Sequence, residues 1–193
     1  MSEERRVVTV LFAGLVGIEG ASSPDPEDAA EAAAEVVDAG FTRFRRVIEA
    51  RGGTVDKVVG DTIMGVFGAP VAHEDDAERA VRAGLRMQER LDQLNRDAGT
   101  DLRMRVGINT GEVLVGAIRA GGDYTAMGDV VNTASRLQSI AQPGQVVVGP
   151  TTHAATARSV SYEPLGSLSV KGREEAVQAW HAIGAIAPPG FRS

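Results

Sequence analysis

The 193-residue sequence contains no cysteine, few aromatic residues and no long apolar segment. The absence of cysteine excludes disulfides and thiolate metal sites, so we expect an intracellular, cytoplasmic protein. No apolar run approaches the roughly 18 residues that a membrane-spanning helix needs, and we therefore expect no membrane contact within this chain. The charged N-terminus leads directly into a strand-like segment, which is not the pattern of a signal peptide.

An excess of basic residues is also absent. The chain has 20 Lys and Arg against 26 Asp and Glu, for a net charge of -6. Domains that bind nucleic acid usually carry a basic face, so we expect no nucleic-acid partner. A nucleotide substrate remains compatible with this charge, because a few local cations are enough to hold a triphosphate.

The residue pattern predicts one sheet covered by helices. The apolar, β-branched residues 7–13 predict a buried strand, and residues 54–59 and 62–67 predict a hairpin around Gly60-Asp61. We expect two further strands, 102–109 and 113–118, joined by a tight turn near Thr110-Gly111. The other predicted elements are helices at 25–50, 73–95, 129–140 and 151–157, and strands at 145–148, 161–165 and 177–183. This order predicts an α/β fold with residues 1–184 as one domain and 185–193 as a flexible tail.

Three segments combine polar residues with glycines in a way that points to chemistry. They are Lys57-Val58-Val59-Gly60-Asp61 at the hairpin tip, RVGINTGEV from Arg105 to Val113, and YTAMGDVVNTASRL from Tyr124 to Leu137. In this order and spacing they closely resemble the catalytic domain of bacterial class III adenylyl and guanylyl cyclases, over about residues 6 to 184. The resemblance implies an α+β sandwich with a ferredoxin-like core and a small C-terminal α/β extension.

The reaction implied by this resemblance is the conversion of ATP to 3',5'-cyclic AMP and pyrophosphate. In this family the ribose 3'-oxygen of the substrate attacks its α-phosphorus at the interface of a head-to-tail dimer, which here would be a homodimer. The cofactor is Mg²⁺ or Mn²⁺. Its transition-state asparagine and arginine match Asn132 and Arg136, whose i, i+4 spacing places them on one helix face. An arginine suits a developing phosphate charge because it is always ionised and has several donors.

The family's nucleotide-binding positions are also present. Lys57 and Thr125 match the pair that reads adenine, because a lysine donates to a ring nitrogen and a threonine accepts from an exocyclic amine. The alternative is a solvated lysine and an ordinary turn threonine. Arg105 and Lys171 match positions that bind the outer phosphates. In a symmetric homodimer, Lys57 and Asp61 would serve opposite sites.

The metal site is where the sequence departs from the family. Asp61 matches one of two metal-binding aspartates, but the other position, after Phe12-Ala13, is Gly14. Glu19 is a candidate substitute five residues later. Two functions therefore stay open: an adenylate cyclase of low activity, and a catalytically impaired domain that serves as a nucleotide-binding or regulatory dimerisation module.

Overall fold

A computed structural model describes residues 5–17, 25–114, 128–168 and 176–186. Seven strands form one sheet in the order β2-β3-β1-β4-β5-β7-β6. The strands are β1 (Arg5–Val16), β2 (Thr54–Val59), β3 (Thr62–Phe67), β4 (Arg103–Leu114), β5 (Val146–Val148), β6 (Val160–Leu168) and β7 (Val177–Ala185). The described helices are α1 (Pro26–Ala50), α2 (Asp76–Ala98), α4 (Asp129–Ile140) and α5 (Pro150–Thr156). The predicted α/β fold is confirmed.

The long antiparallel strands β1 and β4 form the centre of the sheet. They pair without interruption from Arg5 opposite Leu114 to Val16 opposite Arg103. The predicted turn near Thr110-Gly111 is therefore wrong, since both residues lie inside β4. Gly111 has another role, because a Cβ there would be 2.6 Å from Cγ2 of Val130. This glycine allows α4 to approach the sheet.

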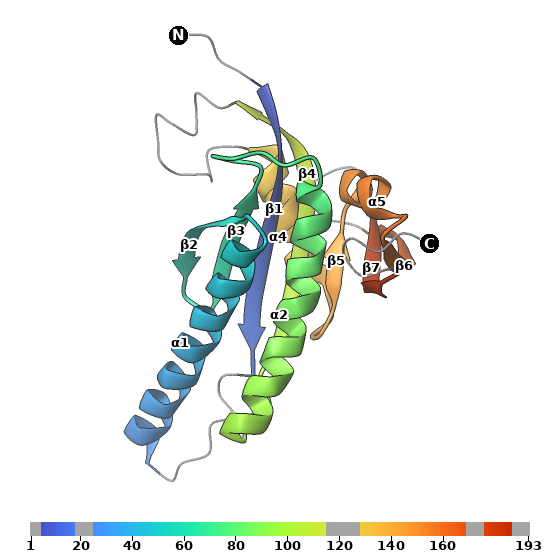
Figure 1. Cartoon of the computed structure of the whole chain (residues 1–193). Helices are drawn as coiled ribbons and strands as arrows, with labels where there is room; N and C mark the ends of the chain where they lie inside the picture. The colour runs from blue at the N-terminus through green and yellow to red at the C-terminus, as the bar shows by residue number, and fades with distance from the viewer. Residues whose placement is uncertain (1–4, 18–24, 115–127, 169–175, 187–193) are drawn as a thin grey trace.

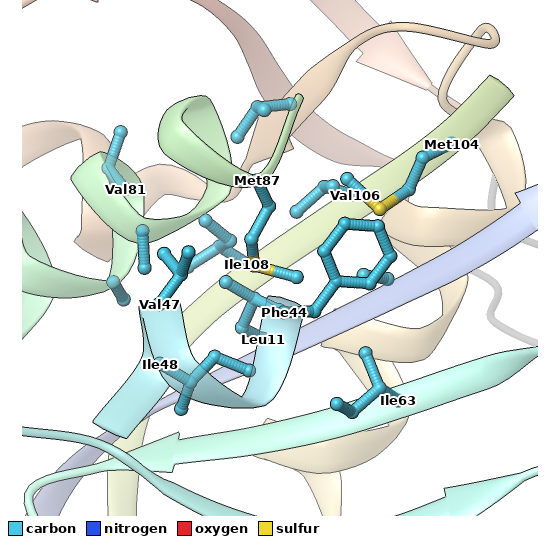
Figure 2. Close-up of a cluster of buried hydrophobic side chains, with 14 of the residues drawn as sticks. Leu11, Phe44, Val47, Ile48, Ile63, Val81, Met87, Met104, Val106 and Ile108 are labelled. Carbon is cyan, nitrogen blue, oxygen red and sulfur yellow. The ribbon is translucent and has the colours of Figure 1, made fainter. Parts of the chain in front are cut away.

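Helices α1 and α2 lie side by side on one face of the sheet (Figure 1). The predicted start of α1 is confirmed: the Asp25 side chain caps it by accepting a hydrogen bond of 3.0 Å from the Glu27 N–H. The core between these helices and the sheet contains fully buried Phe44, Ile48 and Met87 packed against Leu11 and other residues of β1, β3 and β4 (Figure 2). This apolar layer packs the central strands against the helices.

Helix α4 covers the opposite face, and its predicted bounds are confirmed. Val130, Val131 and Ala134 pack there against Val8 and Val10 of β1. In Figure 1, α4 accordingly lies behind β1 and β4, with α1 and α2 in front. The even-numbered residues of β1 face α4, and the odd-numbered residues from Leu11 to Leu15 face α1 and α2.

The C-terminal part extends the sheet beyond β4. Strand β5 runs parallel to β4, and β7 joins β5 to the edge strand β6 in an antiparallel arrangement. Helix α5 is tied to the centre by buried threonine hydroxyls, with Thr110 Oγ1 2.9 Å from that of Thr9 and 2.7 Å from that of Thr152. None of the described helices has the length and apolar character to cross a membrane.

Candidate functional site

Gly14 and Asp61, the two positions that the sequence matches to the family's metal-binding aspartates, lie side by side at one end of the sheet. Gly14 on β1 is paired with Thr62 of β3 on one side and with Arg105 of β4 on the other. The hairpin turn that carries Asp61 is fastened to the same place, because the Leu15 N–H donates a 2.9 Å hydrogen bond to the Asp61 carbonyl oxygen. Residues separated by about half of the chain are thus brought together.

Asp61 presents its carboxylate to solvent at the turn between β2 and β3. Its Oδ1 accepts a 3.2 Å hydrogen bond from the Thr62 hydroxyl, which leaves the other carboxylate oxygen available. An exposed carboxylate held on a short hairpin is a suitable cation ligand. The described residues contain no group of three or more His, Cys, Asp or Glu side chains that would bind a metal. Glu19, the candidate substitute, lies outside the described residues.

Gly14 offers no ligand, and the space beside it is occupied by Gln138 of α4. A Cβ built on Gly14 would collide with the Gln138 side-chain amide and lie 3.3 Å from Oγ1 of Thr62. The described residues therefore fit one cation at Asp61 and do not fit the pair that two aspartates would hold. Sequence reasoning missed Gln138, since nothing in the local pattern shows what faces Gly14 across the fold.

Arg105 completes this cluster from β4. It is opposite Gly14 in an antiparallel pair, so both residues face the α4 side of the sheet. Its Nε is buried and has no hydrogen-bond partner within the described part of the chain. A buried guanidinium N–H without a partner is costly, and an acceptor atom on a bound group would satisfy it.

Lys57 lies on the neighbouring hairpin strand β2. An irregularity between Val55 and Lys57 shifts the register so that Lys57 pairs with Met64 of β3. Met64 packs in the core on the α4 side, and Lys57 is therefore on the same face of the sheet as Gly14 and Arg105. Of the two residues of this hairpin that the sequence singled out, Lys57 lies on strand β2 and Asp61 lies in the turn after it.

Asn132 and Arg136 lie on the side of α4 away from the sheet. Ala134 is fully buried between them in sequence, while Asn132 is exposed and Arg136 half-buried. At about 100° per residue, both side chains point away from Ala134 and from the sheet. Within one protomer they are thus not directed at Gly14, Asp61 and Arg105. The remaining predicted site residues, Thr125 and Lys171, lie outside the described residues.

The depth of α4 on the sheet depends on a second glycine. A Cβ on Gly107, two residues after Arg105, would collide with the backbone N of Gln138 and lie 2.5 Å from the Ala134 carbonyl oxygen. Glycine at this position allows the helix backbone to lie directly on β4. The glycine in the motif from Arg105 onward therefore positions the helix that carries Asn132 and Arg136.

Comparison with known proteins shows the family to which the chain belongs. A family model described as the adenylate and guanylate cyclase catalytic domain matches residues 1–182. Adenylate cyclase 1 of Rhizobium meliloti is 34% identical over 191 residues; the match covers 94% of this chain and 28% of that protein. The chain thus spans less than a third of that relative.

Solved cyclase structures share the fold over nearly the whole chain. The adenylyl cyclase CyaB from P. aeruginosa superposes with a TM-score of 0.83 at 30% identity, over 95% of this chain and 96% of that one. The guanylyl cyclase Cya2 gives the same TM-score, 0.83, at 33% identity, over 99% and 98% of the two chains. One of these structures is an adenylyl cyclase and the other a guanylyl cyclase, so overall structural similarity does not distinguish between ATP and GTP as the substrate.

Proposed function

Because this chain belongs to the family of class III adenylyl and guanylyl cyclase catalytic domains, we propose that it acts as an adenylate cyclase domain. In the proposed reaction the ribose 3'-oxygen of ATP bonds to the α-phosphorus, and the bond from that phosphorus to the pyrophosphate oxygen breaks. The products are 3',5'-cyclic AMP and pyrophosphate, and the hydroxyl proton leaves to solvent. We place the reaction in the cytoplasm, which supplies ATP.

The observation that carries the proposal is that the candidate site residues form two groups that face different directions within one protomer. Asp61, Gly14 and Arg105 cluster at one end of the sheet, while Asn132 and Arg136 point away from the sheet on the far side of α4. A head-to-tail homodimer would place the helix face of one protomer opposite the cluster of the other. Each composite site would then contain a carboxylate, a phosphate-binding arginine and the Asn132–Arg136 pair.

Each side chain in this composite site has a defined proposed role. Arg105 binds the outer phosphates through the buried face of its guanidinium, and Lys171 assists it. Asn132 and Arg136 contact the transferring phosphorus and stabilise charge that develops there. Arg136 is held in place because its helix is anchored to the sheet by buried Leu137.

We propose ATP over GTP as the substrate because of Lys57 and Thr125. Lys57 lies on the α4 face of the sheet, and we propose that it reaches across the dimer interface from there. Its ammonium group donates to a ring nitrogen of adenine, and Thr125 accepts from the exocyclic amine. The support for this assignment is the match of both residues to the adenine-reading pair of the family.

The cofactor is Mg²⁺ or Mn²⁺, as in the family, with Asp61 as its ligand from this chain. The cation neutralises charge on the phosphates when it is bound. Gly14 contributes no oxygen atom, so we propose that the triphosphate supplies the remaining coordination. Turnover is expected to be slow for this reason.

A second function is favoured by one specific observation. Gln138 fills the space in which a second metal-binding carboxylate would stand, so the site is closed to that ligand as it is built. A domain of this kind would bind nucleotide or support dimerisation in a regulatory role without turnover. The retained Asn132 and Arg136 favour the enzyme, because a purely regulatory domain has no chemical need for them.

The test is to assay purified protein for cyclic AMP with Mg²⁺ and with Mn²⁺, alongside nucleotide binding by calorimetry. Production of cyclic AMP by the original protein, and its loss in Arg136→Ala, would support the adenylate cyclase proposal. Nucleotide binding without any product, in both metals and at high protein concentration, supports the regulatory module. Cyclic GMP formed from GTP at the same rate would reject the proposed base preference.

A further inference from the structure

A groove lined by arginines lies between α1 and α2, on the face of the sheet opposite α4. Its volume is about 500 Å³. Five arginines line it, against a single acidic residue: Arg43, Arg46, Arg51, Arg86 and Arg90, with Asp97. The chain as a whole has a net charge of -6, so this groove concentrates positive charge on an otherwise acidic protein.

Much of this positive charge is not neutralised by the protein. Arg43 is 4.0 Å from Asp97, and Arg86 forms a 2.6 Å ion pair with Glu89. Within the described residues, the other three arginines of the groove make no ion pair. Burial lowers the pKa of Arg51, and the neighbouring guanidinium groups of Arg82 and Arg86 lower it further, while the Glu89 carboxylate opposes this effect. The cations are therefore crowded against one another.

The arginines are held in two rows on rigid helices. Arg43 and Arg46 are three residues apart on α1, and Arg86 and Arg90 are four apart on α2, so each pair shares a helix face. The two helices run antiparallel (Figure 1). Arg43 in the middle of α1 lies near Asp97 at the end of α2, whereas the carbonyl of Arg51 after the end of α1 accepts a hydrogen bond from Arg79 near the start of α2. From Arg43 to Arg51 the groove extends about 12 Å along α1.

This arrangement favours a ligand with several phosphate groups. A single phosphate engages two or three donors, whereas guanidinium groups on both walls over this length suit phosphates that are spaced apart. Apolar parts of the lining are Val47 and Ala50, and among the described residues no aromatic side chain lines the groove. Without a stacking surface the groove does not offer recognition of a nucleobase.

We propose that this groove is a binding site for a ligand that carries several phosphate groups. It lies on the opposite face of the sheet from the candidate active site, so its occupation does not depend on the cyclase proposal. A soluble polyphosphate compound and a phosphorylated lipid headgroup present the same clustered charge. The acidic surface of the rest of the protein disfavours a long polyanion such as a nucleic acid.

The first experiment is calorimetric titration of the 193-residue chain with inorganic triphosphate, in buffer that contains a chelator and no divalent cation. We expect saturable binding that weakens as salt is added, because the contacts are ionic. The double variant Arg46→Gln/Arg90→Gln should bind about tenfold more weakly or worse. The matched control Arg96→Gln/Arg158→Gln removes the same charge from exposed sites outside the groove and should leave the affinity unchanged.

A further variant separates the groove from the candidate active site. In the background of Arg105→Ala, which removes the proposed phosphate-binding arginine of the candidate active site, triphosphate binding should persist. It should still weaken about tenfold when Arg46→Gln/Arg90→Gln is added, since Arg105 lies on the other face of the sheet. Equal weakening in the control pair, or weakening only in Arg105→Ala, would overturn the proposal whatever the cyclase assay shows. Circular dichroism of each variant confirms that the fold is retained.

Vesicles distinguish the two sources of phosphate. The chain is sedimented with phosphatidylcholine vesicles, with and without a phosphorylated phosphatidylinositol. Triphosphate binding without vesicle binding assigns the groove to a soluble ligand, and vesicle binding that is lost in Arg46→Gln/Arg90→Gln assigns it to a lipid headgroup. Binding of neither probe rejects the site.

Discussion

The side-chain amide of Gln138, on α4, occupies the space into which a side chain at Gly14, on β1, would extend. The obstacle is the far end of a flexible side chain, whereas at Gly107 it is the backbone of the same helix. Gly14 lies in a regular strand and has no positive φ, so its backbone accepts any residue. The obstacles to a carboxylate at this position are therefore side chains, the Gln138 amide first and the Thr62 hydroxyl second.

Restoring that carboxylate should raise activity. We expect the original protein to turn over mainly with Mn²⁺, which binds nitrogen and oxygen ligands more tightly than Mg²⁺. Gly14→Asp should increase the Mg²⁺-dependent rate by about tenfold or more, which is about 1.4 kcal/mol of barrier. Adding Gln138→Ala should increase the rate further, because the amide no longer competes for the space.

The measurement is cyclic AMP production across Mg²⁺ and Mn²⁺ concentrations. Gly14→Asn is the matched control, since it has the same shape without the charge, and it should give no gain in Mg²⁺. If the original protein is already fully active with Mg²⁺ and Gly14→Asp adds nothing, then another ligand such as Glu19 fills the site.

Asn132→Ala and Arg136→Ala should reduce turnover far more than nucleotide binding. Contacts made only in the transition state lower kcat and kcat/KM together. Loss of one such donor typically costs about 10²–10³ in kcat. Steady-state kinetics and calorimetric binding of ATP separate the two effects, with Arg96→Ala, an exposed arginine of α2 on the opposite face of the sheet, as the control. An unchanged kcat in either variant would remove that residue from the site.

The base preference should depend on Lys57. A buried donor left without its partner costs about 1–3 kcal/mol, so we expect a rate with ATP about tenfold or more above that with GTP. Lys57→Ala should reduce this preference while cyclic AMP production persists at a lower level. Competing ATP and GTP in one reaction measures the ratio directly. Equal rates for the original protein would contradict the assignment.

Two inactive variants should restore activity when mixed. In the proposed homodimer, Asp61 and Arg136 of one protomer serve opposite sites, so a dimer of Asp61→Asn with Arg136→Ala has one intact site. Random exchange makes half of the dimers mixed, and about a quarter of the original activity should return. The control is each variant mixed with itself. No recovery after demonstrated subunit exchange would place both residues in one protomer's site.

Alanine at two glycines under α4 should have unequal effects on stability. Gly107→Ala forces a methyl group into the helix backbone, and overpacking of this kind costs about 1–3 kcal/mol. Gly14→Ala only displaces the Gln138 side chain and should cost less. Urea unfolding followed by circular dichroism gives both free energies of unfolding. A cost at Gly14 equal to that at Gly107 would show that Gln138 is fixed in place.

Local pattern alone was sufficient for most elements of this fold. The cap at Asp25, the hairpin around Gly60-Asp61 and the helix 129–140 were predicted within a residue or two. Each of these depends on interactions between residues close in the chain, such as a capping side chain or a helical repeat of apolar residues. The family resemblance likewise rests on three short segments that are visible in the sequence.

The tertiary structure decided the features that depend on distant partners. The residues Thr110-Gly111 looked like a turn, but twelve residues of β4 pair with β1, and Gly111 instead makes room for Val130. The filling of the Gly14 space by Gln138 and the buried Nε of Arg105 also have no local signature. They arise when α4 packs on β1 and β4, because strand register and helix packing are set by contacts between residues far apart in the chain.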